Sequence, residues 1–394
     1  MAASIPQPAT TGTTSLPMTI PEILTTGTID PAFETAWKSR GSPSGVAPAP
    51  IPALSAMVAS YLPQMQSALA ASRPSSVIET EHTVLLSTGF RSRVLVCSRT
   101  GTATATAKAP VILLFHGGGG CLGFPELELP LARRLAADLD AVVVLPSYRL
   151  APQHPFPAGV QDAWAAVQLV ARQLREPPSS LPSLPRRPPP GQADFRPDPD
   201  TTLPIPPHAD PAGGFMVGGS SSGANMAGVL ARLARDERLH PALTGQVLVC
   251  GAWLDPGRVP EACASRYLSR EQNAEAPVLT QGFVGEFLAA YRPDEESALW
   301  APLSNPREGD TGLGVGGLPP GYFQVCGMDV NRDDGLIYER ALREEAGVAT
   351  RMDLYGGWPH CFWDAYPELE ISRRRAEDYV KGVRWLLGQR KGSG

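Results

Sequence analysis

The sequence predicts an α/β fold in which helices cover both faces of a mostly parallel, doubly wound central sheet. Two observations lead to this prediction. Short, largely apolar runs recur along the chain, and segments of helix length separate them. At 394 residues and 43% hydrophobic composition, the chain can bury one large core. We therefore expect one α/β domain with appended segments.

The strands are expected in a definite order. Residues 83–86 and 94–98 alternate in strand fashion around Thr88-Gly89-Phe90, which predicts a hairpin at the N-terminal edge of the sheet. A helix is expected over residues 158–174. The apolar runs that predict parallel strands are 111–115, 141–145, 215–218, 246–250, 322–326 and 351–355.

Composition divides the rest of the chain. Residues 1–28 are rich in Pro, Thr and Gly, so we expect a disordered N-terminus, whereas helical spacing in residues 29–75 predicts two cap helices. Residues 76–394 then form the main domain. Within it, the proline-dense segment 176–213 predicts an insertion. It precedes a strand, so we place it at the N-terminal edge, away from the edge where ligands bind; it is interpreted as a surface loop without a role, with a spacer or docking segment as the alternative.

Charge and cysteine usage exclude several classes of protein. The net charge is −5, and the single dense basic group, Arg373-Arg374-Arg375, is interpreted as the solvated side of a helix, so no nucleic-acid partner is expected. No apolar run is long enough for stable membrane insertion. The six cysteines lack the paired spacing of a zinc or redox site. With no recognisable secretion signal, these features predict a cytoplasmic protein with reduced thiols; a homodimer is left open.

The pentapeptide Gly219-Ser220-Ser221-Ser222-Gly223 is the most informative motif. It follows the strand-like run that starts at Phe215 and precedes a helical pattern, which is typical of a nucleophilic serine on a strand-to-helix turn. Of its three serines, only Ser221 has glycine two positions away on both sides, as the sharp turn requires. Ser221 is therefore the predicted nucleophile.

The run from His116 to Gly120 predicts the donors that stabilise an oxyanion. Four glycines directly after a strand leave backbone N–H groups unshielded by side chains. We assign Gly118 and Gly119, together with the N–H of Ser222, as the oxyanion hole. The alternative, a phosphate-binding loop, would require a following Lys-Ser or Lys-Thr, which is absent here.

A base and an orienting carboxylate complete the predicted triad. Of the six histidines, His360 follows the last expected strand, where a loop would present it to the serine. The loop after residues 322–326 offers two main carboxylate candidates. Asp329 lies nearest the end of the strand and is preferred; Asp333 is kept as the second candidate and is otherwise explained as a helix N-cap.

Together, five ordered motifs resemble the hormone-sensitive-lipase family of α/β-hydrolases: the glycine run after His116, the corner 148–158, the Ser221 pentapeptide, and the Asp329 and His360 loops. The resemblance covers roughly residues 80–390. It implies the α/β-hydrolase fold, a serine carboxylesterase without metal or cofactor, the triad Ser221, Asp329 and His360, and a second cap segment at 261–299. The corner is expected to be architectural. Ser220, Gln153 and Val330 stand where the family usually has an acidic residue, glutamate and proline.

The sequence therefore predicts hydrolysis of small-molecule esters through an acyl-enzyme, and the family resemblance implies a preference for small-to-medium acyl groups. Two alternatives remain: a related reaction on a specialised metabolite, such as lactone opening, acyl transfer or elimination, and a non-catalytic small-molecule receptor. Several aromatic residues are candidates for the pocket lining, with the core as the alternative place for them: Trp253, Phe283, Phe287, Trp358, Phe362 and Trp363.

Overall fold

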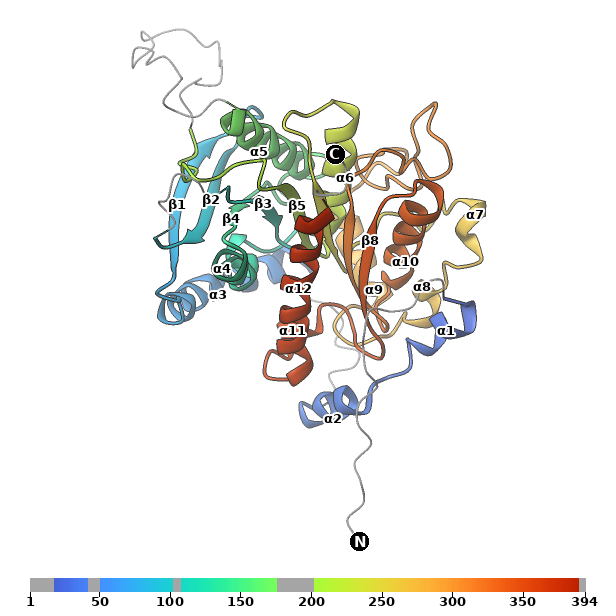
Figure 1. The fold of residues 1–394 in the computed structure, drawn as a ribbon. Coiled ribbons are helices and arrows are strands. Elements are labelled where there is room, and N and C mark those ends of the chain that lie inside the picture. The colour runs from blue at the N-terminus through green and yellow to red at the C-terminus, as the bar shows by residue number, and fades with distance from the viewer. Residues whose placement is uncertain (1–17, 42–49, 102–107, 176–201, 390–394) are drawn as a thin grey trace.

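The computed structural model describes residues 18–41, 50–101, 108–175 and 202–389. In these ranges a twisted eight-stranded sheet lies between layers of helices, in the order β1-β2-β4-β3-β5-β6-β7-β8 (Figure 1). The predicted fold class is confirmed. In chain order the strands are β1 (Val77–Leu85), β2 (Arg91–Arg99), β3 (Val111–Phe115), β4 (Val142–Pro146), β5 (Phe215–Ser220), β6 (Gly245–Val249), β7 (Gly321–Cys326) and β8 (Thr350–Tyr355).

The pairing of the strands follows from the lengths of their connections. β1 and β2 form the predicted antiparallel hairpin, because only a short turn joins them, and β2 is also antiparallel to β4. From β4 to β8 every neighbouring pair is parallel. The carboxyl ends of β5, β7 and β8 therefore meet at one edge of the sheet, which is where ligands bind in such folds.

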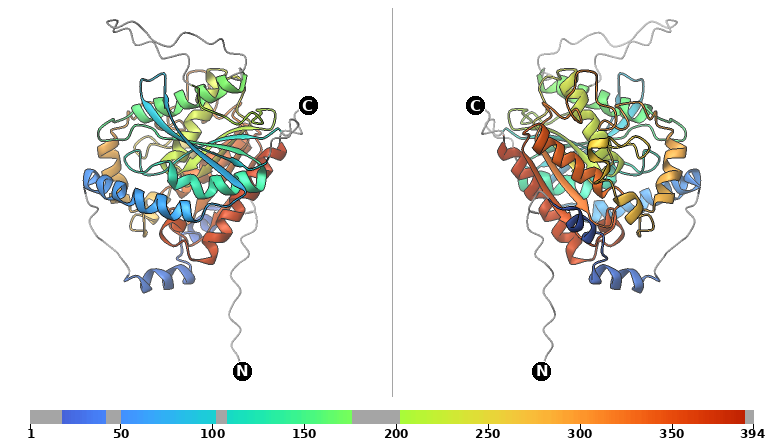
Figure 2. Two further views of the ribbon diagram at one scale, coloured as in Figure 1. Left: turned by 90° about the vertical axis from the view of Figure 1, so that its left-hand side faces the viewer. Right: turned by 90° about the vertical axis from the view of Figure 1, so that its right-hand side faces the viewer.

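The two faces of the sheet bury alternate side chains of each strand. In β3, Val111, Leu113 and Phe115 belong to one apolar cluster, while Ile112 and Leu114 belong to another. The first cluster includes residues of α5 (Ala158–Arg175), α6 (Ser222–Asp236) and α10 (Arg332–Arg340), which a π-helical turn (Ala341–Glu345) extends. The second includes α4 (Leu129–Leu139) and α12 (Glu370–Gln389). Figure 2 shows these helices on both sides of the sheet.

The N-terminal segment is more structured than its composition suggested. Helix α1 (Ile20–Thr25) lies inside the range expected to be disordered, so that prediction is wrong for residues 18–28; residues 1–17 lie outside the described part. Composition missed two local features. The Thr19 side chain and Glu22 form a capping box, and Ile23 is buried against the main domain. The capping box, the buried Ile23 side chain and the hydrogen bond from Gln272 Nε2 to the O atom of Leu24 at 2.7 Å together place this short helix.

Two helices occur in residues 29–75, as predicted, and they pack in different places. Helix α2 (Pro31–Ser39) begins after Asp30, whose side chain accepts a hydrogen bond from Ala32 N, and buries Phe33 against Trp358 and Tyr366. Helix α3 (Ile51–Ala71) instead contacts α9 (Gln281–Tyr291). The first helix thus supports the loop after β8, and only the second joins the segment 261–299.

Segment 261–299 connects β6 to β7 and contains α7 (Glu261–Ala264), α8 (Ser269–Gln272) and α9. The predicted insertion 176–213 joins α5 to β5, and its residues 176–201 lie outside the described ranges. Its last part packs onto the domain: Leu203 is buried in the core and Ala209 bridges Ala109. Residues 202–213 are therefore part of the packed domain, so the predicted insertion is too long at its C-terminal end.

Two further observations concern surfaces. The guanidinium of Arg375 on α12 is buried and lies 3.7 Å from the ring centroid of Trp363, so the prediction that this arginine faces solvent is wrong. A long planar cation can be buried against an aromatic face, which composition alone cannot reveal.

Among the described residues, no helix has the length and apolar character needed to cross a membrane.

Candidate active site

The strand-to-helix turn at Ser221 has the strained geometry that the motif predicts. Ser221 lies between β5 and α6 with φ 54° and ψ −120°, a conformation that non-glycine residues rarely adopt. A Cβ on Gly219 would lie 2.3 Å from Phe115 O, and one on Gly223 would lie 2.0 Å from the same atom. Both glycines are therefore required by the close approach of β3 to the turn.

The structure brings the three residues of the predicted triad together. Nε2 of His360 lies 2.9 Å from Oγ of Ser221, and Nδ1 lies 2.6 Å from Oδ2 of Asp329. Asp329 follows β7 and His360 follows β8, so adjacent parallel strands deliver the acid and the base to one edge. The N–H of Asn331 donates to Oδ1 of Asp329 at 2.9 Å, which holds the carboxylate in place.

Asp333, the second carboxylate candidate, lies elsewhere. Its Oδ2 accepts hydrogen bonds from the backbone N–H groups of Leu268 and Ser269, both at 2.6 Å, and its Oδ1 pairs with Arg332 at 2.7 Å. It is not the N-cap of α10 as predicted, because Asn331 occupies that position. Asp333 instead ties segment 261–299 to the main domain.

Burial and charge set the pKa values of His360 and Asp329. Burial lowers the pKa of His360, but the Asp329 carboxylate outweighs this effect and raises the pKa to about 9. Burial also raises the pKa of Asp329, and His360 opposes that shift. Both side chains are more than nine-tenths buried. The imidazole is therefore a stronger base than a free histidine.

The glycine run after β3 forms a tight turn. Gly118, Gly119 and Gly120 all have positive φ, and the O atom of Gly118 accepts hydrogen bonds from the N–H groups of Cys121 and Leu122. Within the described chain, no hydrogen bond uses the N–H of Gly118 or Gly119. These N–H groups are available to a bound oxygen.

The side chains behind that turn are structural. His116 is buried and its ring stacks on Tyr148 with centroids 4.4 Å apart, while the Tyr148 hydroxyl donates to the O atom of His116 at 2.8 Å. Burial lowers the pKa of His116 to about 4, so it is neutral. Arg149 pairs with Asp162 at 2.7 Å. The corner 148–158 thus fixes the glycine turn through hydrogen bonds and packing, in agreement with its predicted architectural role.

A largely apolar cavity of about 810 Å³, including its open mouth, leads to Ser221. Of the predicted oxyanion residues, Gly119 and Ser222 line it, together with Gly120, but Gly118 does not. The wall opposite comes from the segment 261–299, and none of the described residues between 29 and 75 lines the cavity. The lining residues of that segment are Arg270, Leu279, Val284, Phe287, Leu288 and Tyr291.

The structure decides between the two places left open for the candidate aromatic residues, and most of them belong to the core. Only Phe287 lines the cavity, whereas Trp253, Trp358 and Phe362 are buried in the core. Phe283 packs beside Phe287 with ring centroids 4.6 Å apart, and Trp363 packs against Phe362. Nothing in the local sequence distinguishes a core aromatic from a lining one, because both occur near the ends of strands and on apolar helix faces.

Sequence reasoning missed one polar partner. Ser220 takes the position where the family usually has an acidic residue, and its Oγ donates to Oε1 of Glu128 at 2.6 Å. Glu128 ends the 3₁₀ turn η1 (Pro125–Glu128), and burial raises its pKa to about 7. A carboxyl group therefore lies next to the nucleophile turn, but another part of the chain supplies it. Its distance in sequence, 92 residues, leaves no local signal.

A family model described as alpha/beta hydrolase fold matches residues 112–364. The chain belongs to the hormone-sensitive-lipase family of α/β-hydrolases. As a member of this family it is a carboxylesterase-like enzyme, so the receptor alternative is set aside. The matched range contains Ser221, Asp329 and His360.

Individual proteins support this membership. An AB hydrolase superfamily protein of Schizosaccharomyces pombe is 32% identical over 281 residues, covering 71% of this chain and 72% of that protein. Carboxylesterase NlhH of Mycobacterium tuberculosis is 33% identical over 248 residues, 62% of this chain and 63% of that protein. The crystal structure of vibralactone cyclase superposes with a TM-score of 0.77 at 26% identity, covering 96% of this chain and 99% of that one.

Proposed function

We propose that this enzyme hydrolyses small-molecule carboxylic esters through an acyl-enzyme on Ser221. The observation that carries the proposal is the continuous line of hydrogen-bond contacts from Ser221 Oγ through His360 to Asp329, at 2.9 and 2.6 Å. A serine hydroxyl is a weak nucleophile until a neighbouring base accepts its proton, and this arrangement supplies the base and the group that orients it.

In the first half-reaction, Nε2 of His360 accepts the Ser221 proton while Oγ attacks the ester carbonyl. Asp329 accepts a hydrogen bond from Nδ1–H, which fixes the tautomer and stabilises the imidazolium. The imidazolium then protonates the departing alcohol. Water enters in the second half-reaction, gives its proton to His360 and releases the acid from the serine.

The oxyanion of each tetrahedral intermediate needs donors that are already in position. The proposed donors are the N–H groups of Gly118, Gly119 and Ser222. The positive φ angles of both glycines support this assignment, as does the absence, in the described part of the chain, of other hydrogen bonds from their N–H groups. Gly119 and Ser222 also border the cavity beside Ser221.

The cavity supports a preference for small-to-medium acyl groups. Its wall is mainly aliphatic and aromatic, so an apolar acyl or alcohol group loses contact with water on binding. The Phe287 ring lies against Gly119, where an added Cβ would meet its Cδ1 at 2.3 Å. That ring limits the space directly over the proposed oxyanion hole.

Replacing Ser221 with alanine tests the mechanism. We expect the rate on a nitrophenyl butyrate ester to fall by roughly 10⁴-fold or more, because the acyl-enzyme cannot form. A fluorophosphonate probe should label the wild type at Ser221 and leave Ser221→Ala unlabelled. Ser60→Ala, which removes an exposed serine on α3, is the matched control and should behave as wild type. Hydrolysis by Ser221→Ala at the wild-type rate would refute the proposal.

Internal acyl transfer is a second candidate because the chain superposes on vibralactone cyclase over nearly its full length. In that reaction a hydroxyl of the substrate, instead of water, would attack the acyl-enzyme, and a lactone would leave. Incubating the enzyme with a hydroxy-acyl ester in H₂¹⁸O separates the two reactions. Hydrolysis incorporates ¹⁸O into a free acid, whereas cyclisation gives an unlabelled lactone.

A further inference from the structure

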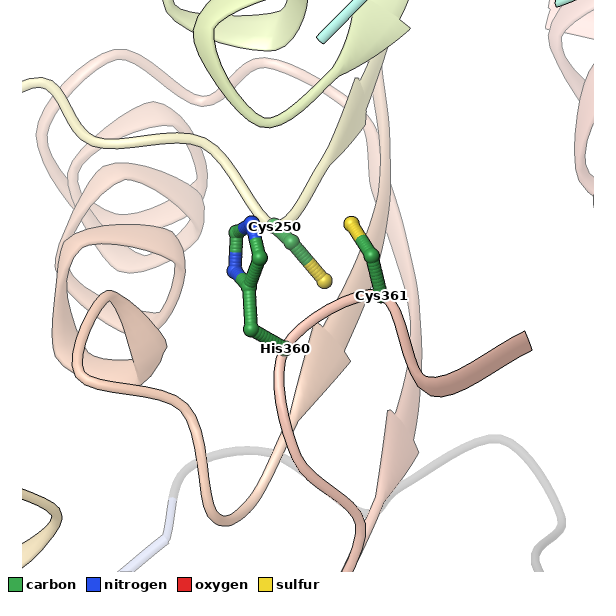
Figure 3. Close-up of side chains that lie close together, drawn as sticks. All are labelled: Cys250, His360 and Cys361. Atoms are coloured by element: carbon green, nitrogen blue, oxygen red, sulfur yellow. The ribbon is translucent and has the colours of Figure 1, made fainter. Parts of the chain in front are cut away.

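Two sulfur atoms lie next to the proposed catalytic base, and a third lies beside one of them. The ligand atoms of Cys250, His360 and Cys361 all lie within 4.8 Å of one another, and all three residues are buried. Figure 3 shows the Cys250 and Cys361 side chains beside the His360 ring. Sγ of Cys326 lies 3.5 Å from Sγ of Cys250. All four residues come from the ends of β6, β7 and β8 or the loop that follows, so the parallel sheet assembles them.

Backbone conformation holds two of these residues in place. Cys250 has φ 52° and Cys361 has φ 45°, in the left-handed region that non-glycine residues seldom occupy. Cys250 N donates to the O atom of Gln324, and Cys361 is the N-cap residue of the short helix α11 (Phe362–Ala365). The two thiols are therefore presented by a fixed framework. All six cysteines of the chain are free thiols, so these groups are available as ligands.

We propose that Cys250, Cys361 and His360 bind a thiophilic d¹⁰ cation such as Zn²⁺ or Cd²⁺, and that its binding switches off ester hydrolysis. Two thiolates and one imidazole are a donor set that such cations prefer. Two sulfurs bound to one zinc ion at about 2.3 Å lie about 3.8 Å apart in a tetrahedron. The Cys250–Cys326 separation is already close to that value, so Cys326 can complete a fourfold set.

Inhibition follows from the use of the same imidazole, and this part rests on the proposed function. Nε2 of His360 contacts Ser221 and Nδ1 contacts Asp329. A cation needs one of these nitrogen lone pairs, so it breaks one of the two contacts. An imidazole bound to the cation through Nε2 cannot accept the serine proton, and one bound through Nδ1 loses its orienting carboxylate.

Charge and proton balance are compatible with a bound cation. The carboxylates of Asp329 and Asp364 act electrostatically on His360, so the surroundings favour positive charge. On binding, each thiol releases one proton to solvent as its sulfur becomes a thiolate ligand, while the imidazole binds in its neutral form. No oxidant or reductant is required, and removing the cation with a chelator restores the thiols.

Binding is tested first without catalysis. Cd²⁺ is added to the reduced full-length Ser221→Ala protein, and the ultraviolet charge-transfer absorption of Cd²⁺–thiolate bonds is followed. We expect saturation at one ion per chain. Introducing Cys250→Ser or Cys361→Ser should weaken binding at least tenfold, with Cys250→Ala as a second variant in case the serine disturbs folding. Cys97→Ala, a buried cysteine of β2 outside the cluster, is the matched control and should bind as its parent does.

Hydrolysis is then measured on proteins that retain Ser221. Zn²⁺ should lower the wild-type rate at least tenfold, EDTA should restore it, and Cys250→Ser should shift the inhibiting concentration upward at least tenfold relative to Cys97→Ala. Absence of stoichiometric Cd²⁺ binding, or unchanged binding in both cluster variants, overturns the site. Full occupancy with undiminished hydrolysis overturns the switch. If the chain has no esterase activity at all, the absorption titration still decides whether the site exists.

Discussion

Glu128 offers a test of how the nucleophile turn is supported, because a buried carboxyl group with one side-chain hydrogen-bond partner among the described residues should make stability depend on pH. Its Oε1 accepts the hydrogen bond from Ser220 Oγ at 2.6 Å, and the side chain is almost completely buried. The perturbation is Glu128→Gln, which keeps an oxygen acceptor of the same reach for Ser220 but cannot ionise.

The size of the expected pH effect on stability follows from the pKa of Glu128. Burial raises the pKa of Glu128 from 4.5 to about 7, and the hydrogen bond from Ser220 opposes this only in part. The folded protein therefore keeps a proton that the unfolded chain releases. The resulting stabilisation is complete below about pH 4.5 and is lost as the pH rises through about 7. Between about pH 5 and pH 8 the loss amounts to about 2.5 kcal/mol, at roughly 1.4 kcal/mol for each pKa unit.

The assay is equilibrium urea unfolding of both proteins, followed by tryptophan fluorescence at several pH values. The free energy of unfolding of Glu128→Gln, relative to wild type, should rise by about 2.5 kcal/mol from pH 5 to pH 8. Glu126→Gln is the matched control two residues away. Burial raises the pKa of Glu126, but Arg93 outweighs burial, and the pKa is lowered. The free energy of unfolding of the wild type, relative to Glu126→Gln, should therefore decrease as the pH falls. A pH-independent difference for Glu128→Gln would refute the reasoning.

Three further predictions concern catalysis. A neutral imidazole must accept the serine proton, and the pKa of His360 is raised to about 9. We therefore expect kcat/KM to increase with pH through the alkaline range. A pH profile of kcat/KM that rises only at or below the usual histidine pKa would contradict this prediction. Asp329→Asn should lower kcat by roughly 10⁴-fold. Asp333→Asn should instead lower the melting temperature and change kcat by less than about tenfold. Equal losses of kcat in the two variants would reject Asp329 as the acid of the triad. Gly119→Ala, whose new Cβ would meet an α9 ring at 2.3 Å, should reduce kcat by roughly 10²- to 10³-fold, while Gly285→Ala on α9, where space is open, should leave it near wild type in the same rate assay.

Much of the fold could be predicted because its signals are local. The apolar runs became strands within one or two residues of their expected bounds, since a buried parallel strand must be apolar on both faces. Ser221 and the glycines after His116 were identifiable because a sharp turn and an unshielded N–H each restrict residue type over a few positions. Helix α1 was missed because a cap, a buried side chain and hydrogen bonds from distant segments hold it in place, and composition does not weigh these contacts.

The sequence by itself determined the residue types of the proposed chemistry and the order in which they follow the strands. Only the tertiary structure decided which of them meet. It separated Asp329, beside His360, from Asp333, which binds the start of α8, although the two are four residues apart. It also paired Ser220 with Glu128 and gathered Cys250 and Cys361 beside His360. Such contacts depend on the register and order of parallel strands, which arise from long-range packing and leave no pattern in the neighbouring residues.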